Sequence, residues 1–239
     1  MRIPRVFVDL PLAAGREVAL PKEARQHMER VLRLKPGHPV IAFNGQGGQF
    51  SAELLGGGSL RLLAFEDSSS ESPLPVRLIQ GISKGERMDV TLQKATELGA
   101  TRISPVTTGR SVVKLDEERA ERRHGRWSGI LQSACEQCGR NVLPQLDELK
   151  RLDTVLAEKD GNATRIVLAP EGASSLAEIG RPLALEVLIG PEGGLSDEEI
   201  ATAIDRGFTA VRLGPRILRT ETAGLALLAA AQTLWGDFA

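Results

Sequence analysis

Short apolar runs separated by glycine-rich turns fill the first 66 residues of the chain. These runs lie at 5–8, 18–20, 39–43, 49–54 and 60–63. Several short strands with turn signals at this spacing predict a small β-barrel. One helical stretch is expected at 21–32, because Pro21 suits the first position of a helix.

The polar stretch 67–73 separates this pattern from a different one, and it predicts a linker between a first domain at 1–70 and a second at 74–239. Apolar runs beyond it alternate with helical patterns. The predicted strands lie at 76–81, 102–106, 165–168, 187–189 and 210–213, and the predicted helices at 87–98, 116–136 and 152–158 and after 196 and 220. Such alternation predicts an α/β domain whose largely parallel sheet is covered on both faces.

Two glycine-rich loops follow neighbouring predicted strands near the end of the chain. The first is 190–194, after which Ser196 and Glu199 form a capping box that opens a helix. The second begins at Gly214-Pro215 and leads into an Ala/Leu-rich helix that starts at Thr220 or Thr222. Ligands bind at the carboxyl ends of parallel strands, so the two loops predict a ligand crevice.

The charge distribution and the N-terminal sequence limit the classes of protein to which this chain can belong. The chain has 239 residues and a net charge of −1, but residues 1–66 carry +3, residues 74–145 carry +4 and residues 146–239 carry −6. Basic segments in a neutral chain permit nucleic-acid binding, although solvated surface charge is the simpler explanation and is favoured here. The N-terminus lacks a signal-peptide core and no apolar run reaches membrane-span length, which predicts a cytoplasmic protein.

Familiar catalytic and metal-binding motifs are missing from the sequence. It contains no P-loop, no G-x-G-x-x-G after a strand and no G-x-S-x-G nucleophile elbow. Cys135 and Cys138 cannot complete a structural zinc site by themselves, and the histidines are scattered, so no metal is expected. The remaining signal is loops whose backbone can approach a heterocycle and a ribose closely.

Five blocks of sequence, taken together and in this order, resemble the RsmE family of bacterial 16S rRNA methyltransferases, which belongs to the SPOUT class. The blocks are Lys84-Gly85-Glu86-Arg87, 93–99, 136–140, 189–194 and 213–223, and 30–37 near the N-terminus also matches. Cys138 departs from the pattern, since serine is expected there more often. The resemblance covers nearly the whole chain.

The resemblance implies a fold, a cofactor and partners that the pattern alone does not give. It implies a SPOUT-type trefoil-knotted domain with a parallel sheet, preceded by a small PUA-like β-barrel that binds RNA. It also implies a homodimer that binds S-adenosyl-L-methionine (SAM) and methylates N3 of a uridine in 16S rRNA, in the free RNA or in the small ribosomal subunit. Two alternatives stay open: a SPOUT enzyme acting on another RNA such as tRNA, and a non-catalytic RNA-binding protein.

Candidate site residues follow from the two loops and this resemblance. Uridine N3 carries a proton that must leave, which calls for a base or a cation that stabilises the anion. The candidate bases are Glu221 and Glu192, and the candidate cations are Arg219, which is preferred, and Arg140. Glu221 can also serve only the dipole of the last helix. The expected SAM-binding residues are Leu168, Ala169, Ile189, Gly190, Pro191, Glu192, Gly193, Leu213, Gly214, Ile217, Leu218, Thr220, Thr222 and Ala223. The expected RNA contacts are Arg2, Arg5, Arg25, Arg30, Arg33, Lys84, Arg110 and Arg140.

Overall fold

The computed structural model describes residues 3–111, 117–158 and 161–238, so that Arg2 and Asp116 lie outside the described part of the chain. The chain forms two compact units. The first contains residues 1–71 together with 132–143, and the second contains residues 72–131 and 144–239. The segment 132–143 thus packs within the first unit, although its sequence neighbours belong to the second.

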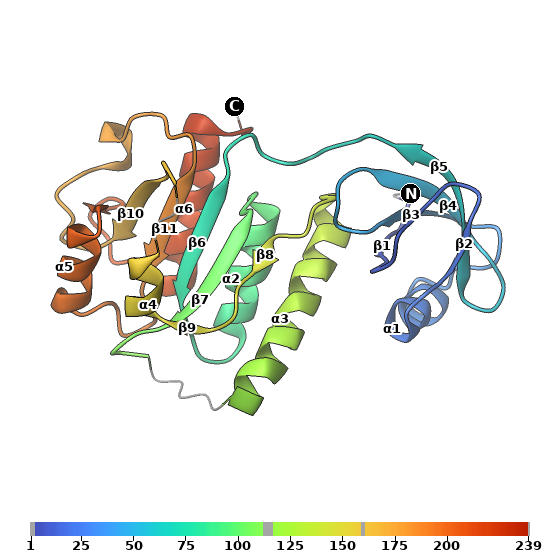
Figure 1. Cartoon of the computed structure of the whole chain (residues 1–239), viewed down its shortest axis with the longest axis horizontal. Helices are drawn as coiled ribbons and strands as arrows, with labels where there is room; N and C mark the ends of the chain where they lie inside the picture. Colours follow the sequence, from blue (N-terminus) through green and yellow to red (C-terminus); the bar gives the residue numbers. More distant parts are fainter. Residues whose placement is uncertain (1–2, 112–116, 159–160, 239) are drawn as a thin grey trace. The chain divides into compact units, whose positions relative to one another are not determined.

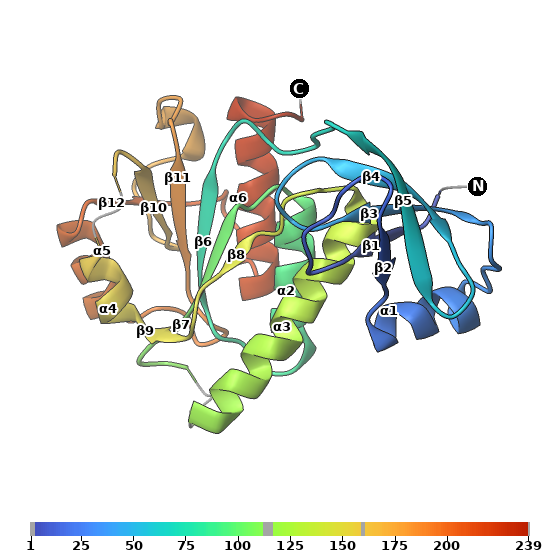
Figure 2. The ribbon, with the colours of Figure 1, turned by 45° about the vertical axis from the view of Figure 1, so that its right-hand side comes forward.

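The first unit is built on an open, five-stranded half-barrel sheet (Figure 2). Its strands are β1 (Arg5–Phe7), β2 (Glu17–Ala19), β3 (Pro39–Phe43), β4 (Gln49–Leu54) and β5 (Ser59–Glu66), in the spatial order β1-β3-β4-β5-β2. Only the β1–β3 pair is parallel. Alternate side chains such as Val40, Ala42, Leu60 and Leu62 fill the core, because successive residues of a strand face opposite sides.

The predicted helix at 21–32 is divided into two different helical forms. Helix α1 (Lys22–Gln26) passes into a π-helical turn, η1 (His27–Val31), in which the Leu32 amide donates to the His27 carbonyl at 3.0 Å. The turn buries Met28 in the core and leaves the Val31 side chain exposed. Arg33 follows with φ of 54°, a left-handed conformation that costs a non-glycine residue energy. Departures of this kind often lie at functional positions.

The second unit contains a sheet in which every strand pair is parallel (Figure 1). Its strands are β6 (Val76–Gly81), β7 (Arg102–Thr107), β8 (Gln145–Leu146), β9 (Lys150–Arg151), β10 (Thr164–Leu168), β11 (Leu185–Ile189) and β12 (Phe208–Val211). The order is β12-β10-β11-β6-β7-β8, with β9 also beside β7. The sequence did not predict β8, β9 or the 3-10 turn η2 (Leu176–Glu178), because pieces this short carry no periodicity.

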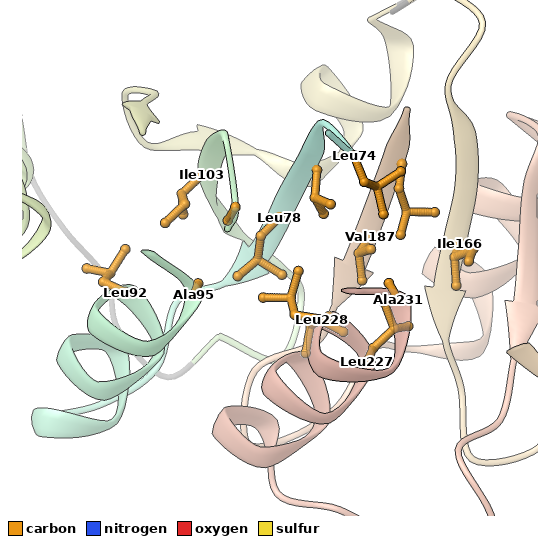
Figure 3. Close-up of a cluster of buried hydrophobic side chains, with 14 of the residues drawn as sticks. Leu74, Leu78, Leu92, Ala95, Ile103, Ile166, Val187, Leu227, Leu228 and Ala231 are labelled. Carbon is orange, nitrogen blue, oxygen red and sulfur yellow. The ribbon is translucent and has the colours of Figure 1, made fainter. Parts of the chain in front are cut away.

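Helices cover both faces of this sheet. The first face packs against α2 (Glu86–Glu97), α3 (Glu117–Cys138) and α6 (Thr220–Trp235), and the second against α4 (Leu152–Ala157) and α5 (Asp197–Asp205). Figure 3 shows Leu92 and Ala95 of α2 and Leu227 and Leu228 of α6 directed at the strands that carry Leu78 and Val187. All six of these side chains are almost completely buried.

The last helix returns from the edge of the sheet to its centre. Strand β12 is an edge strand, yet α6, which follows it, lies against β6 and β11. Helix α6 lies against these strands: a Cβ atom on Gly224 would make ordinary van der Waals contacts, at 3.5 Å with Ile189, 3.7 Å with Gln80 and 3.8 Å with Leu78. The trefoil knot implied by the sequence resemblance belongs to this part of the chain.

A row of charged side chains crosses the buried centre of the sheet at one register. Glu186 on β11 lies between Arg165 on β10 and Arg77 on β6, which is in turn beside Arg102 on β7. The Glu186 carboxylate accepts hydrogen bonds from Arg77 at 3.0 Å and from Arg165 at 2.6 Å. Neighbouring Arg77 and Arg102 would repel each other, but Asp147 lies 3.5 Å from the first and 2.8 Å from the second.

Glu186→Gln tests how much this row contributes to stability. The side chain of Glu186 is only 1% exposed, so its loss leaves Arg77 and Arg165 buried beside a neutral amide. Removing one partner of a buried ion pair costs about 3–5 kcal/mol, and we expect a loss in that range in urea unfolding.

Glu17→Gln is the matched control, because it breaks the surface pair between Glu17 and Arg61, whose side chains are 56% and 49% exposed. Exposed pairs contribute about 0–1 kcal/mol. Equal, small losses in both variants would show that the buried row does not stabilise the sheet.

Candidate functional site

A cavity of about 930 Å³ opens at the carboxyl ends of β10, β11 and β12. The three strands end at the same level, since Leu168 pairs with Val211 and Val167 with Leu188. Predicted cofactor-binding and catalytic residues that line it are Leu168, Ala169, Ile189, Gly190, Pro191, Glu192, Gly193, Leu213, Ile217, Leu218, Arg219, Thr220, Glu221 and Ala223. The parallel sheet therefore brings residues from three separate loops to one hollow, as expected for this sheet type.

Two residues predicted for the cavity do not line it. Thr222 is exposed, because the first turn of α6 directs its neighbours Thr220, Glu221 and Ala223 to the cavity instead. Gly214 is also exposed and lies in the turn that leads away from β12. Proximity in sequence to the loop therefore does not decide which residues line the cavity.

Glycine is required in the cavity wall because backbone segments approach one another closely. A Cβ atom on Gly190 would lie 2.9 Å from the Leu195 nitrogen and 3.0 Å from the Gly194 carbonyl carbon. A Cβ atom on Gly81, at the end of β6, would lie 2.6 Å from the Pro191 nitrogen. Any side chain at these two positions must displace the 190–195 loop.

Three buried polar groups fix this loop to the start of the last helix. The Gln80 amide donates to the Thr220 hydroxyl at 3.0 Å, and the hydroxyl donates to the Gly190 carbonyl at 2.5 Å. Gln80 is fully buried and Thr220 is 7% exposed. The relay joins β6, the loop after β11 and α6, so the cavity walls hold a defined position relative to one another.

Glu192 is held in place as a hydrogen-bond acceptor. Its Oε1 accepts from the Lys84 amide at 2.8 Å and from Arg87 Nη1 at 3.0 Å. Burial alone would raise the pKa of Glu192, but the amides of Lys84 and Glu192 and the Arg87 guanidinium together lower the pKa below its ordinary value. A carboxylate stabilised in its charged form is a weak proton acceptor.

Glu221 has a different environment at the cavity wall. Its Oε1 lies 3.9 Å from Arg87 Nε, beyond hydrogen-bond distance, and its side chain is 20% exposed. Its Oε2 is buried and has no hydrogen-bond partner among the described residues. A buried acceptor without a donor is costly and points to a donor that arrives from a ligand, a water or a substrate.

Arginine side chains surround the mouth of the cavity. Arg87, Arg110, Arg212, Arg216 and Arg219 all line it. Arg219 is exposed, whereas Arg110 donates to the carbonyl oxygens of Gly193 at 3.3 Å and Leu195 at 3.1 Å and so supports the loop. The side chain of Lys84 is exposed, and its backbone amide donates to Glu192.

The other predicted RNA contacts lie in the first unit and divide into two groups. Arg30 and Arg33 are exposed on the π-helical turn and just after it, and Arg25 pairs with Glu29 at 3.1 Å. Arg140 is 4% exposed and bound to Glu71 at 2.6 Å. Arg5 donates to Gln49 and Asn141 and lies over the ring of Phe43.

Arg5 and Arg140, which the sequence also predicted as RNA contacts, are engaged within the first unit. Their guanidinium groups hold the segment 132–143 against the first sheet, and a phosphate would have to displace these internal partners. A basic residue near a sequence motif gives no sign of whether it faces solvent, so this distinction required the structure.

Sequence reasoning missed three residues that the structure places at or near the site. Arg87 lines the cavity and contacts Glu192; Gln80 anchors Thr220; and the buried Ser83 hydroxyl has no hydrogen-bond partner among the described residues. Arg87 belongs to the 84–87 block and could have been found there. Among the described residues there is no cluster of side chains able to hold a metal ion, and no helix long and apolar enough to span a membrane.

Comparison with known proteins identifies the relatives of this chain. The RNA methyltransferase domain family matches residues 70–232. Ribosomal RNA small subunit methyltransferase E of Buchnera aphidicola subsp. Schizaphis graminum is 33% identical over 241 residues, covering 99% of this chain and 98% of that protein. The protein of the same name from Bacillus subtilis is 30% identical over 243 residues, covering 95% and 94%.

Solved structures agree with these matches. The ribosomal RNA small subunit methyltransferase E of Neisseria gonorrhoeae, bound to SAM, matches with a TM-score of 0.93 and is 41% identical. The match covers 100% of both chains. A Legionella pneumophila protein solved as a methyltransferase with bound SAM has a TM-score of 0.95, 37% identity and 100% coverage of both chains. The chain therefore belongs to the ribosomal RNA small subunit methyltransferase E family, and its fold is the SPOUT-type α/β fold of these enzymes.

Proposed function

We propose that this protein transfers a methyl group from SAM to N3 of a uridine in 16S rRNA. The main support for this proposal is a cavity of about 930 Å³ at the carboxyl ends of three parallel strands, together with the match to the RNA methyltransferase domain family. SAM-dependent methylation of ribosomal RNA is the activity of the family. The choice of uridine N3 rests on the resemblance of the glycine loops and of the 84–87 and 213–223 blocks to those of the RsmE enzymes.

The cavity residues fit SAM. Leu168, Ile189, Leu213 and Leu218 give the wall an apolar part, and the loops 190–194 and 168–172 offer backbone groups at close range. Its volume lies within the range of about 300–1,000 Å³ that small-molecule sites occupy. When bound, SAM supplies an electrophilic methyl group on a sulfonium, and the C–S bond breaks with its electron pair left on sulfur as the N–C bond forms.

The chain itself has to hold the uridine and take its proton. We assign the proton from N3 to the Oε2 atom of Glu221, because this buried oxygen lacks a donor among the described residues. Arg219, exposed at the cavity mouth, orients the base or the adjacent phosphate. Glu192 serves as a structural acceptor, since its lowered pKa suits an ion-pair partner better than a base. A uridine in a stacked region must leave the stack to reach these groups.

A related enzyme acting on tRNA would use the same cavity. The RNA named for the curated relatives is the small-subunit ribosomal RNA, which favours 16S rRNA here. We infer that the reaction occurs in the cytoplasm, where this RNA is made and assembled. The substrate can be identified by incubating the enzyme in parallel with transcribed 16S rRNA, with assembled small subunits and with tRNA. The RNA that gains methyl groups is the substrate.

Gly190→Val is expected to abolish both SAM binding and methylation. The added Cβ meets the backbone of Gly194 and Leu195, so the loop cannot keep its shape. Calorimetry with SAM measures the first effect, and mass spectrometry of digested 16S rRNA measures 3-methyluridine.

Gly180→Val is the control, because a Cβ on Gly180 has no atom within 4 Å. We expect it to bind SAM and methylate as the wild type does. Undiminished SAM binding by Gly190→Val would place the cofactor elsewhere, and wild-type protein that methylates a different atom or RNA would refute the assignment to uridine N3.

We propose that the π-helical turn and Arg33 contact RNA phosphates. Arg30 and Arg33 are exposed there, beside the exposed Val31, and the first 66 residues carry a net charge of +3. The left-handed Arg33 and the π-turn are conformations that a purely structural helix does not need.

Replacing Arg30 and Arg33 together by Ala should weaken RNA binding and flatten its dependence on salt. Each lost phosphate contact removes about 0.7–0.9 from the slope of log K against log salt, so two contacts remove about 1.4–1.8. Fluorescence anisotropy at several salt concentrations gives the slope, and SAM affinity should stay unchanged. Arg61→Ala is the control, since Arg61 is exposed and pairs with Glu17; an unchanged slope in the double variant would make Arg30 and Arg33 ordinary surface charges.

We also propose a C₂ homodimer formed in part by α6. Leu234, at the end of the helix, is 51% exposed, and Ile217, in the loop before it, is 86% exposed. Small residues such as Ala226 and Ala230 allow another helix to approach closely. Light scattering at micromolar concentration should give twice the mass of one chain, and Leu234→Glu should lower it toward a monomer; a monomeric wild type would refute the proposal.

A further inference from the structure

Arg87 is the single residue that α2 contributes to the described wall of the cavity. It lies in the first turn of that helix, and its side chain is 44% exposed. The sheet places the start of α2 beside the loop after β11, because Gly81 at the end of β6 touches Pro191. Arg87 therefore reaches residues that lie more than a hundred positions later in the sequence.

The guanidinium of Arg87 lies between two carboxylates. Its Nη1 donates to Glu192 at 3.0 Å, whereas its Nε lies 3.9 Å from Glu221. Glu192 also accepts the Lys84 amide at 2.8 Å, so its position is fixed from two sides. A guanidinium bonded to a fixed carboxylate can present its remaining N–H groups in one direction only, because the group is planar.

Glu221 is held less directly than Glu192. Its Oε1 faces Arg87 without a hydrogen bond, and its Oε2 is buried without a partner among the described residues. The other charged residues of the cavity wall near it in sequence, Arg216 and Arg219, are exposed. Arg87 and Glu192 are therefore the charged groups whose positions are fixed next to Glu221.

We infer that Arg87 is a positioning residue that holds Glu221 in the orientation needed to accept the proton of the substrate imide. The inference rests on the proposed function above. One oxygen of Glu221 is attracted to the guanidinium, so the other is left for the substrate. The proton moves from the imide nitrogen to that oxygen and then to water, while Arg87 keeps its own protons and Glu192 keeps Arg87 in place.

A double-mutant cycle tests this chain of contacts. The variants are Arg87→Gln, Glu221→Gln and the two together, assayed for kcat and for KM with 16S rRNA. A positioned base contributes about 10²–10⁴-fold to a rate, so losing only its positioning should lower kcat about 10–100-fold. We expect KM for RNA and the SAM affinity to change less than about threefold, and Arg87→Gln to have little further effect once Glu221 is Gln. Arg87→Lys should recover part of the lost kcat.

Arg126→Gln is the control variant. Arg126 is a 66% exposed arginine on α3 that pairs with Asp89 of α2 and does not line the cavity. It removes the same charge from the same part of the fold, so kcat should remain that of the wild type. Thermal unfolding of every variant separates a loss of folding from a loss of rate.

Three results would overturn the inference. A higher KM for RNA with unchanged kcat in Arg87→Gln would make Arg87 an RNA contact. The loss of kcat in Arg87→Gln could instead add to the loss in Glu221→Gln and disappear when Glu192 is already Gln. Arg87 would then only connect two loops through Glu192. Wild-type protein that binds SAM but does not methylate 16S rRNA would refute the proposed function together with this inference. If the wild type is active but the effects of Arg87→Gln and Glu221→Gln on kcat are independent, only the inference is refuted.

Discussion

The buried relay from Gln80 through Thr220 to Gly190 is the contact on which the architecture of the cavity depends. It joins the end of the central strand β6, the glycine loop after β11 and the first residue of α6. Gln80 is fully buried and Thr220 is almost so, and a buried donor or acceptor left unpaired costs about 1–3 kcal/mol. The relay thus favours one position of the last helix, in which Thr220, Glu221 and Ala223 face the cavity.

Three glutamate side chains have different roles because different groups surround their carboxylates. Glu186 is enclosed by two arginines in the middle of the sheet and serves the fold. One oxygen of Glu192 accepts from both an amide and a guanidinium, which favours its charged form. Glu221 retains an oxygen without a partner among the described residues. The number of donors that reach each oxygen, rather than the residue type, decides which carboxylate is able to take a proton.

Arginines divide in the same way between structure and proposed recognition. Arg5 and Arg140 are bonded within the first unit, where they hold the distant segment 132–143. Arg30 and Arg33 stay exposed because the π-helical turn buries Met28 and directs its other residues outward. A long side chain with a charge at its end suits both tasks, so its partners must be seen before its role can be assigned.

The sequence by itself determined the alternation of strands and helices and the two loops at strand ends, because periodicity and glycine and proline positions are local properties. Strands such as 39–43, 49–54 and 76–81 match the observed bounds. Only the tertiary structure decided that 132–143 joins the first unit, that 21–32 contains a π-turn, and that Arg87 stands between Glu192 and Glu221. Those features arise from contacts between residues far apart in the chain, and the local sequence does not specify which distant residue each one contacts.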